Sequence, residues 1–114
     1  MILTRIGDSY RQMGNLDTAK DFYQKALNIE YDSYAVLGLA LINKEKGNYP
    51  EAIESLTGML SNDPKNPRLY QEIAQCWIAL ARKDKALETL TRAARMGVKS
   101  LGLAETLEKI QRMG

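Results

Sequence analysis

The chain has 114 residues, which is enough for one domain with a substantial apolar core. Apolar residues make up 45% and charged residues 26%, as in ordinary globular proteins, and no apolar run approaches the roughly 18 residues of a membrane-spanning helix. The net charge of +2 argues against a strong phosphate-binding field, and the absence of histidine removes the commonest general base and metal ligand.

The single cysteine, Cys76, has no partner for an internal disulfide and no CxxC motif or cationic histidine that would activate it. We expect it to be a buried structural thiol. The sequence therefore predicts no enzyme, no cofactor and no metal site. Residues 1–10 lack the apolar core of a secretory signal, and nothing in the sequence indicates a compartment.

Internal repetition is the strongest pattern in the chain. Gly14 and Gly47 are 33 residues apart, and Ala19, Ala52 and Ala86 follow one another after 33 and 34 residues. A period in this range is typical of stacked helical repeats. One such repeat cannot bury its apolar face alone, so neighbouring repeats must pack against each other.

The first repeat is predicted to contain two helices, at residues 3–13 and 17–28, because apolar side chains recur at helical spacing in both segments. Gly14 between them can adopt the left-handed conformation that ends a helix. Residues 15–17 are expected to cap the second helix by accepting hydrogen bonds from its free backbone amides.

The second repeat is predicted to form helices at residues 34–46 and 50–61. Gly47 lies in the turn between them, and Pro50 suits the first turn of the second helix. Residues 62–67 contain two prolines, which disfavour helix at the preceding positions. This segment is therefore the clearest joint between repeats.

The third repeat pairs residues 68–81 with residues 84–96, and Ala81 stands where the earlier repeats have glycine. Gly97 ends the second of these helices. Residues 101–113 form a last amphipathic segment, which we expect to be a helix that covers the apolar flank of the final repeat.

Small and aromatic residues at matching positions of the three repeats give the chain its family resemblance. Together with other residues at the repeat positions they are Leu3, Ile6, Gly7, Tyr10, Gly14, Ala19, Tyr23 and Ala26, then Val36, Leu39, Ala40, Asn43, Gly47, Ala52, Leu56, Met59 and Pro64, then Tyr70, Ile73, Ala74, Trp77, Ala86, Leu90 and Ala93. Tyr31 and Val98 replace the proline in the first and third repeats. The pattern resembles the tetratricopeptide repeat. The resemblance implies an all-α fold, a right-handed α-solenoid of three helix-turn-helix repeats with a C-terminal capping helix. We expect a single domain with repeats at 1–32, 33–66 and 67–99 and the capping helix at 100–114. The small residues are expected to let the paired helices approach, and the aromatic ones to lie in the core.

The resemblance also implies that the first helix of each repeat lines a concave groove that binds a partner. The candidate groove residues are those off the core stripe of these helices: Thr4, Arg5, Asp8, Tyr34, Leu37, Gly38, Leu41, Glu45, Arg68, Gln71, Glu72 and Gln75.

The helix at 34–46 is unusual because it has a second apolar stripe, formed by Tyr34, Leu37 and Leu41. We interpret this stripe as the floor of the groove, with Gly38 as a dip that admits a partner's side chain. The expected partner is an apolar peptide or an amphipathic helix of another protein. Two alternatives remain open, in which a second copy of the chain or the neighbouring helices cover the stripe.

One branch of the family holds the carboxylates of chaperone C-termini with lysine, asparagine and arginine side chains. Thr4, Asp8 and Glu72 stand at those positions here, so we predict no such carboxylate clamp. RNA binding is a weaker alternative, because a basic cluster near the third repeat lacks exposed aromatic residues beside it. The cluster contains Arg82, Lys83, Lys85, Arg92, Arg95 and Lys99. The sequence thus predicts a scaffold for protein binding, and it is also compatible with a segment of a longer repeat array.

Overall fold

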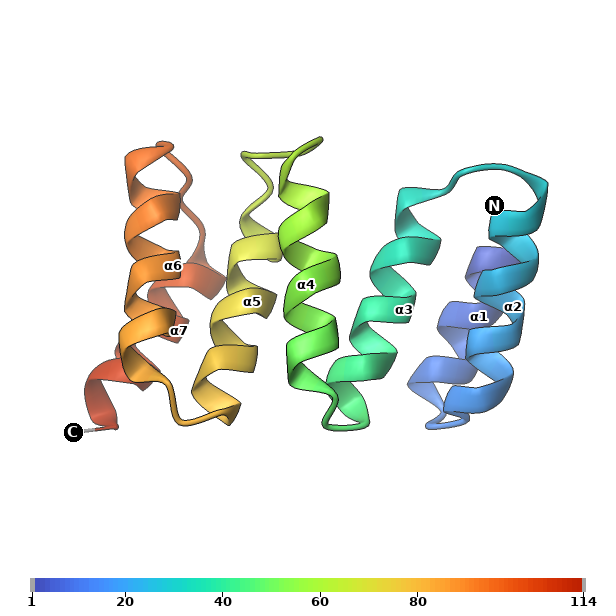
Figure 1. Cartoon of the computed structure of the whole chain (residues 1–114), viewed down its shortest axis with the longest axis horizontal. Coiled ribbons are helices and arrows are strands. Elements are labelled where there is room, and N and C mark those ends of the chain that lie inside the picture. Colours follow the sequence, from blue (N-terminus) through green and yellow to red (C-terminus); the bar gives the residue numbers. More distant parts are fainter. Residues whose placement is uncertain (1, 114) are drawn as a thin grey trace. The chain divides into compact units, whose positions relative to one another are not determined.

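The computed structural model describes residues 2–113, and over this range it consists of α-helices joined by short turns (Figure 1). The helices are α1 (Ile2–Gln12), α2 (Leu16–Ile29), α3 (Ser33–Glu45), α4 (Tyr49–Leu60), α5 (Pro67–Ala79), α6 (Lys83–Arg95) and α7 (Leu101–Arg112). Every predicted helix is confirmed, and each end lies within two residues of the prediction. Among the described residues, no helix is long and apolar enough to cross a membrane.

Four of the helices end in the same way, with one residue in the left-handed region. Gly14, Gly47 and Gly97 have φ angles of 83°, 82° and 75°, and Ala81 has a φ of 59°. The next backbone amide then donates back across the last turn, as in the 2.9 Å bond from the Arg82 amide to the Trp77 carbonyl. Ala81 thus takes the backbone conformation of the glycines at the matching repeat positions, although the prediction placed it inside the helix at 68–81.

Side-chain caps begin three of the helices. The side chain of Asp32 accepts a hydrogen bond from the Tyr34 amide, Asn66 accepts one from the Arg68 amide, and Ser100 accepts one from the Leu103 amide. The predicted cap at Asn15 is wrong, because its side chain makes no capping hydrogen bond to α2.

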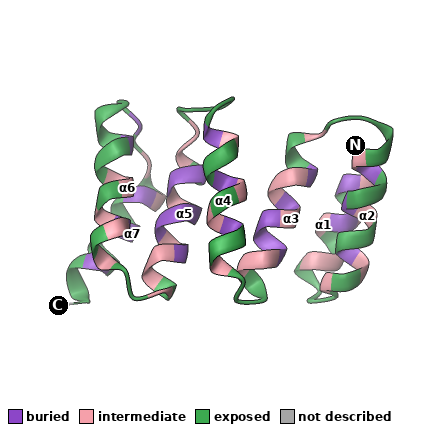
Figure 2. Cartoon of the chain, viewed as in Figure 1, coloured by how far each residue is buried: buried purple, intermediate pink, exposed green. Residues whose placement is uncertain are grey.

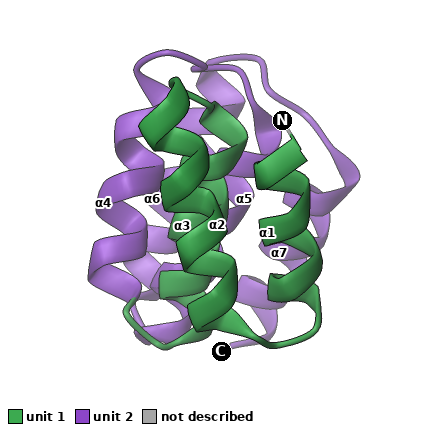
Figure 3. Cartoon of the chain, turned by 90° about the vertical axis from the view of Figure 1, so that its right-hand side faces the viewer, with its two compact units in different colours: residues 1–48 green, residues 49–114 purple. Residues whose placement is uncertain are grey.

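The helices group into two compact units, Met1–Asn48 and Tyr49–Gly114 (Figure 3). The boundary falls in the turn between the two helices that the sequence assigns to the second repeat. Unit 1 contains α1, α2 and α3, and unit 2 contains α4 to α7.

The core of unit 1 is built around Tyr23 of α2, which is completely buried. Two glycines lie close to its ring: a Cβ atom added to Gly7 of α1 would lie 2.8 Å from the ring, and one added to Gly38 of α3 would overlap it. Ala35 and Ile42 of α3 belong to the same buried cluster. The small residues therefore let α1 and α3 pack directly against one aromatic side chain.

The core of unit 2 is built around α5, which packs against α4, α6 and α7. Figure 2 shows buried residues along α5, whereas most of the visible side of α6 is exposed. Tyr70 is buried and donates a 2.6 Å hydrogen bond to the Pro64 carbonyl in the preceding loop. Cys76 is a buried thiol, as predicted.

Candidate functional site

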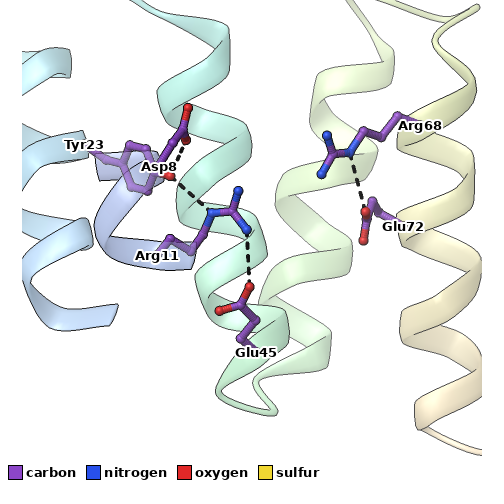
Figure 4. Close-up of polar contacts among 6 residues, drawn as sticks. All are labelled: Asp8, Arg11, Tyr23, Glu45, Arg68 and Glu72. Atoms are coloured by element: carbon purple, nitrogen blue, oxygen red, sulfur yellow. Dashed lines mark hydrogen bonds and ion pairs between the residues drawn. The ribbon is translucent and has the colours of Figure 1, made fainter. Parts of the chain in front are cut away.

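A polar network extends from the buried ring of Tyr23 to the surface of unit 1 (Figure 4). The Tyr23 hydroxyl donates a 2.5 Å hydrogen bond to Asp8 Oδ1, and Arg11 Nε donates to the hydroxyl oxygen over 3.2 Å. Arg11 also forms a 3.3 Å ion pair with Glu45 of α3. Asp8 and Glu45, both candidate groove residues, thus have partners within unit 1.

This environment keeps the Tyr23 phenol protonated. Burial is the main cause that raises the pKa of Tyr23 to about 12, and the hydrogen bond to the Asp8 carboxylate adds to the shift. Arg11 acts in the opposite direction, since a cation favours the phenolate. The phenol therefore acts as a neutral hydrogen-bond donor that ties α2 to α1.

A second polar contact joins the start of α1 to the start of α3. Thr4 donates a 2.6 Å hydrogen bond to Asp32 Oδ2, while Asp32 Oδ1 accepts the Tyr34 amide over 2.9 Å. The bond from Thr4 is the main cause that lowers the pKa of Asp32, and the amide bond adds to it. Because Thr4 is buried, the expectation that it faces a partner is wrong.

Three further candidate groove residues are also buried, which corrects their expected exposure. Gly38 is covered by the ring of Tyr23, so it forms no dip for a partner's side chain. Leu41 is only 5% exposed. In unit 2, Glu72 is 7% exposed and forms a 3.5 Å ion pair with Arg68 (Figure 4).

A stripe of α3 that was not predicted faces α2 and is formed by Ala35, Gly38 and Ile42. The assumption that α3 needs only one packing stripe is wrong. A signal was present, because α3 is apolar on all sides, which is typical of a helix buried on more than one face.

The remaining candidates lie at least partly on the surface. Arg5, Tyr34 and Arg68 are exposed, and Glu45 lies at the surface beside Arg11. Leu37, Gln71 and Gln75 are half-buried. Gln71 packs against Gly102 of α7, which leaves no room for a Cβ atom there. Tyr34 is therefore the most exposed apolar side chain of the predicted groove.

Tyr34 borders a pocket of about 570 Å³ in unit 1, which we call the Tyr34 pocket. Ile2, Ile29 and Tyr31 also line it, and these four side chains are between 64% and 75% exposed. The pocket lies where the start of α1, the end of α2 and the start of α3 meet. Isolated apolar side chains are common on protein surfaces, but a contiguous set around a cavity is typical of an interaction site.

The sequence analysis did not identify Ile2, Ile29 and Tyr31 as candidates. In the repeat pattern, Tyr31 only takes the place of the proline. Ile29 and Tyr31 are apolar residues at a helix end and in the following loop, where polar residues are usual. This was the available signal, but helical spacing alone could not show that Ile2 lies beside them.

Two family models match the chain, and both are described as tetratricopeptide repeat. One matches residues 44–108 and the other residues 2–33. No curated protein sequence gives a significant match. The first match covers more than half of the chain, and the two matches together include most of both units.

Several solved structures have a similar fold. A tetratricopeptide repeat protein from Parabacteroides merdae superposes with a TM-score of 0.85 at 23% identity, over 97% of this chain and 44% of that one. The Hsp90 co-chaperone Cns1 from Saccharomyces cerevisiae gives a TM-score of 0.84 at 21% identity, over 97% of this chain and 38% of that one. PcrH, solved in complex with the chaperone binding region of PopD, gives a TM-score of 0.74 at 23% identity, over 97% of this chain and 84% of that one. The chain spans less than half the length of the first two.

Proposed function

Because the chain belongs to the tetratricopeptide repeat family, whose members typically serve as protein-interaction scaffolds, we propose that it binds an apolar segment of another protein at the Tyr34 pocket. The segment is a peptide or one face of an amphipathic helix. The observation that carries this proposal is the convergence of Ile2, Ile29, Tyr31 and Tyr34 on one cavity.

Burial of these side chains supplies the binding energy. Apolar surface contributes roughly 25 cal/mol per Å² when it leaves water, and a few central aromatic anchors usually dominate the affinity of an interface. Tyr31 and Tyr34 suit this role, because each offers a large ring and a hydroxyl that remains satisfied at a wet rim. Leu37 lies one helical turn beyond Tyr34 and extends the apolar surface along α3.

The neighbouring structures support a protein as the ligand. PcrH has the same fold and is seen with a region of PopD. We transfer from it only the class of ligand, because the sequence identity is low and the groove side chains of this chain are its own.

The proposed ligand is not the acidic C-terminus that the family's carboxylate clamp binds. Asp8 lies at one of the clamp positions. Its side chain accepts a hydrogen bond from the Tyr23 hydroxyl, which fixes the position of the carboxylate. Glu72 lies at another and pairs with Arg68. Within each unit, a carboxylate at the clamp position disfavours an acidic peptide, and in unit 1 the buried hydroxyl of Thr4 supplies no cation.

A second copy of the chain is the alternative ligand, because the same exposed side chains could pack against each other. Sedimentation of the wild type over a range of concentrations separates the two cases. A dimer that dissociates on dilution, and is absent in the Tyr31→Ser, Tyr34→Ser variant, indicates self-association. A monomer at all concentrations leaves the pocket free for an external partner.

Affinity capture with matched variants tests the proposal itself. The Tyr31→Ser, Tyr34→Ser variant should lose a partner that the wild type retains, while a Gln24→Ser, Lys25→Ser variant on the exposed face of α2 should retain it. Circular dichroism must show that both variants are folded. Equal retention by both variants would contradict binding at the Tyr34 pocket.

A further inference from the structure

Unit 2 contains a separate pocket of about 460 Å³ between α4, α5 and α6. Figure 1 shows that α5 lies between α4 and α6. Apolar side chains form its floor, among them Leu60 of α4 and Ile73 and Trp77 of α5. We call this cavity the Trp77 pocket. Trp77 was expected to be a core residue, but it is only half-buried and lines this cavity.

One wall of the Trp77 pocket is positively charged. Lys85, Arg92 and Arg95 of α6 line it together with one carboxylate, that of Glu88. Lys85 and Glu88 form a long ion pair of 3.8 Å. Within residues 2–113, the side chains of Arg92 and Arg95 have neither an ion-pair partner nor a hydrogen-bond partner. Two guanidinium groups thus border an apolar floor, and no carboxylate of the described residues lies within ion-pair distance of either, although Glu88 lines the same wall.

We propose that the Trp77 pocket binds a short acidic and apolar peptide segment of a partner protein. An apolar side chain of the segment packs on Ile73 and Trp77, and flanking carboxylates pair with Arg92 and Arg95. Guanidinium groups bind carboxylates through paired hydrogen bonds, which are stronger than hydrogen bonds between neutral groups. The opposite charges of wall and peptide also favour this ligand over a neutral or basic one.

The composition of the pocket favours a peptide over a nucleic acid. Single-stranded nucleic acids need exposed aromatic faces for base stacking and a row of cations along the backbone. Here the ring of Tyr70 is buried, Trp77 belongs to the floor, and the cations are confined to one side of α6. The floor therefore suits an aliphatic or aromatic side chain better than a sugar-phosphate chain.

This inference is independent of the Tyr34 pocket, because no residue is shared between the two cavities. It also differs from a carboxylate clamp, since the cations lie on α6 and the peptide needs no free C-terminus. The proposal is therefore tested with peptides that are acetylated and amidated at their ends.

Trp77 is the only tryptophan of the chain, so its fluorescence reports directly on the pocket. The probes are capped pentapeptides with a central leucine or phenylalanine and two glutamates on either side, and the matched probes carry glutamine in place of glutamate. The acidic peptides should change the fluorescence saturably, and the neutral ones should bind at least about tenfold more weakly, as expected for lost charged hydrogen bonds.

Charge-matched variants locate the binding. The double variant Arg92→Gln, Arg95→Gln should bind the acidic peptides about tenfold or more weakly than the wild type does. Lys109→Gln with Arg112→Gln removes the same charge from exposed positions on α7 and should change affinity by less than about twofold. Circular dichroism verifies that both variants are folded.

Four outcomes would overturn the proposal. These are no saturable change with the acidic peptides, equal binding of the glutamine peptides, equal losses in the two variants, or tighter binding of an oligouridylate than of the peptides. The last outcome would assign the basic wall to RNA instead. None of them bears on the Tyr34 pocket, whose test uses other variants and another readout.

Discussion

The ring of Tyr23 in α2 lies directly against Gly38 in α3, so closely that a methyl group at position 38 would overlap it. The ring has little room to move, because Gly7 also lies close to it and Asp8 and Arg11 hold its hydroxyl. Gly38→Ala should therefore destabilise the protein, since overpacking costs about 1–3 kcal/mol and outweighs the gain of roughly 1 kcal/mol in helix propensity. Urea unfolding measures the change.

Gly58 of α4 provides the matched control. It lies inside a helix, it is exposed, and a Cβ atom there would meet nothing within 4 Å. Gly58→Ala should stabilise the protein by about 0.5–1 kcal/mol through helix propensity alone. If both variants gain the same stability, Gly38 does not serve as the contact point for Tyr23.

Ala81 offers a way to increase stability. It adopts the left-handed conformation with a φ of 59°, which costs a residue with a Cβ atom about 1–2 kcal/mol. Ala81→Gly removes this strain but increases the freedom of the unfolded chain, so we expect a net gain of about 0.5–1 kcal/mol. The thermal unfolding midpoint measures it.

The reverse substitution, Gly97→Ala, tests the same argument at another helix end. Gly97 has a φ of 75°, and its surroundings are open, so the added methyl group meets no neighbour. We expect the free energy of unfolding to fall by about 1 kcal/mol, because of the backbone conformation alone. A neutral result at both positions would show that these helix ends relax without cost.

Tyr23 should make the protein less stable in alkali. Below pH 10 the phenol is protonated in both states, because an unfolded tyrosine has a pKa of about 10. Between this value and the folded pKa of about 12, the unfolded chain releases the proton while the folded chain keeps it, so stability falls as the pH rises. Tyr23→Phe lacks this contribution.

The free energy of unfolding of the wild type should therefore decrease more steeply than that of Tyr23→Phe across this range. Tyr34→Phe serves as a control that removes one exposed hydroxyl from the same unit. Parallel curves for the wild type and Tyr23→Phe would argue against a protonated, buried phenol.

Asp32 should have the opposite pH dependence. Its pKa is lowered mainly by the hydrogen bond from Thr4, so its stabilising effect is complete above the unfolded value of about 3.9. The effect is lost as the pH falls through the folded pKa. Asp32→Ala removes both the cap of α3 and the partner of Thr4, and it should cost about 1–2 kcal/mol at neutral pH.

Asp32→Asn keeps a capping oxygen but cannot gain a proton in acid. At neutral pH, Asp32→Asn should lose less stability than Asp32→Ala does. In acid, the stability of Asp32→Asn should decline less than that of the wild type. Chemical denaturation at several pH values measures both effects. Equal acid sensitivity of Asp32→Asn and the wild type would rule out this role of the carboxylate.

The sequence predicts the helices well because their signals are local. Apolar spacing, the glycines after helix ends and the prolines at residues 62–67 act within a few residues, and all seven helices follow. Ala81 occupies the repeat position of the glycines, but the prediction kept it in the helix at 68–81, because alanine rarely adopts the left-handed conformation. The cap at Asn15 was predicted wrongly, because residue type alone does not determine whether a side chain turns back to the helix.

The candidate site is predicted less well because exposure depends on contacts distant in sequence. Thr4 and Gly38 were assigned to the groove by their helix positions, but Asp32 and Tyr23 engage them from other helices. The Tyr34 pocket unites Ile2 and Tyr31, which are distant in sequence. Such convergence requires the packing of three helices, which a repeat pattern does not specify.

Site-specific photo-crosslinking tests the central claim most directly. Benzoylphenylalanine replaces Tyr34 at the pocket in one variant and Gln24 on the exposed face of α2 in the other, and each is irradiated in an extract of the source cells. We predict a discrete protein adduct at position 34 that excess wild-type chain suppresses, and no such adduct at position 24. The same adducts at both positions, or none at position 34 from a folded protein, would contradict the proposed role of the Tyr34 pocket.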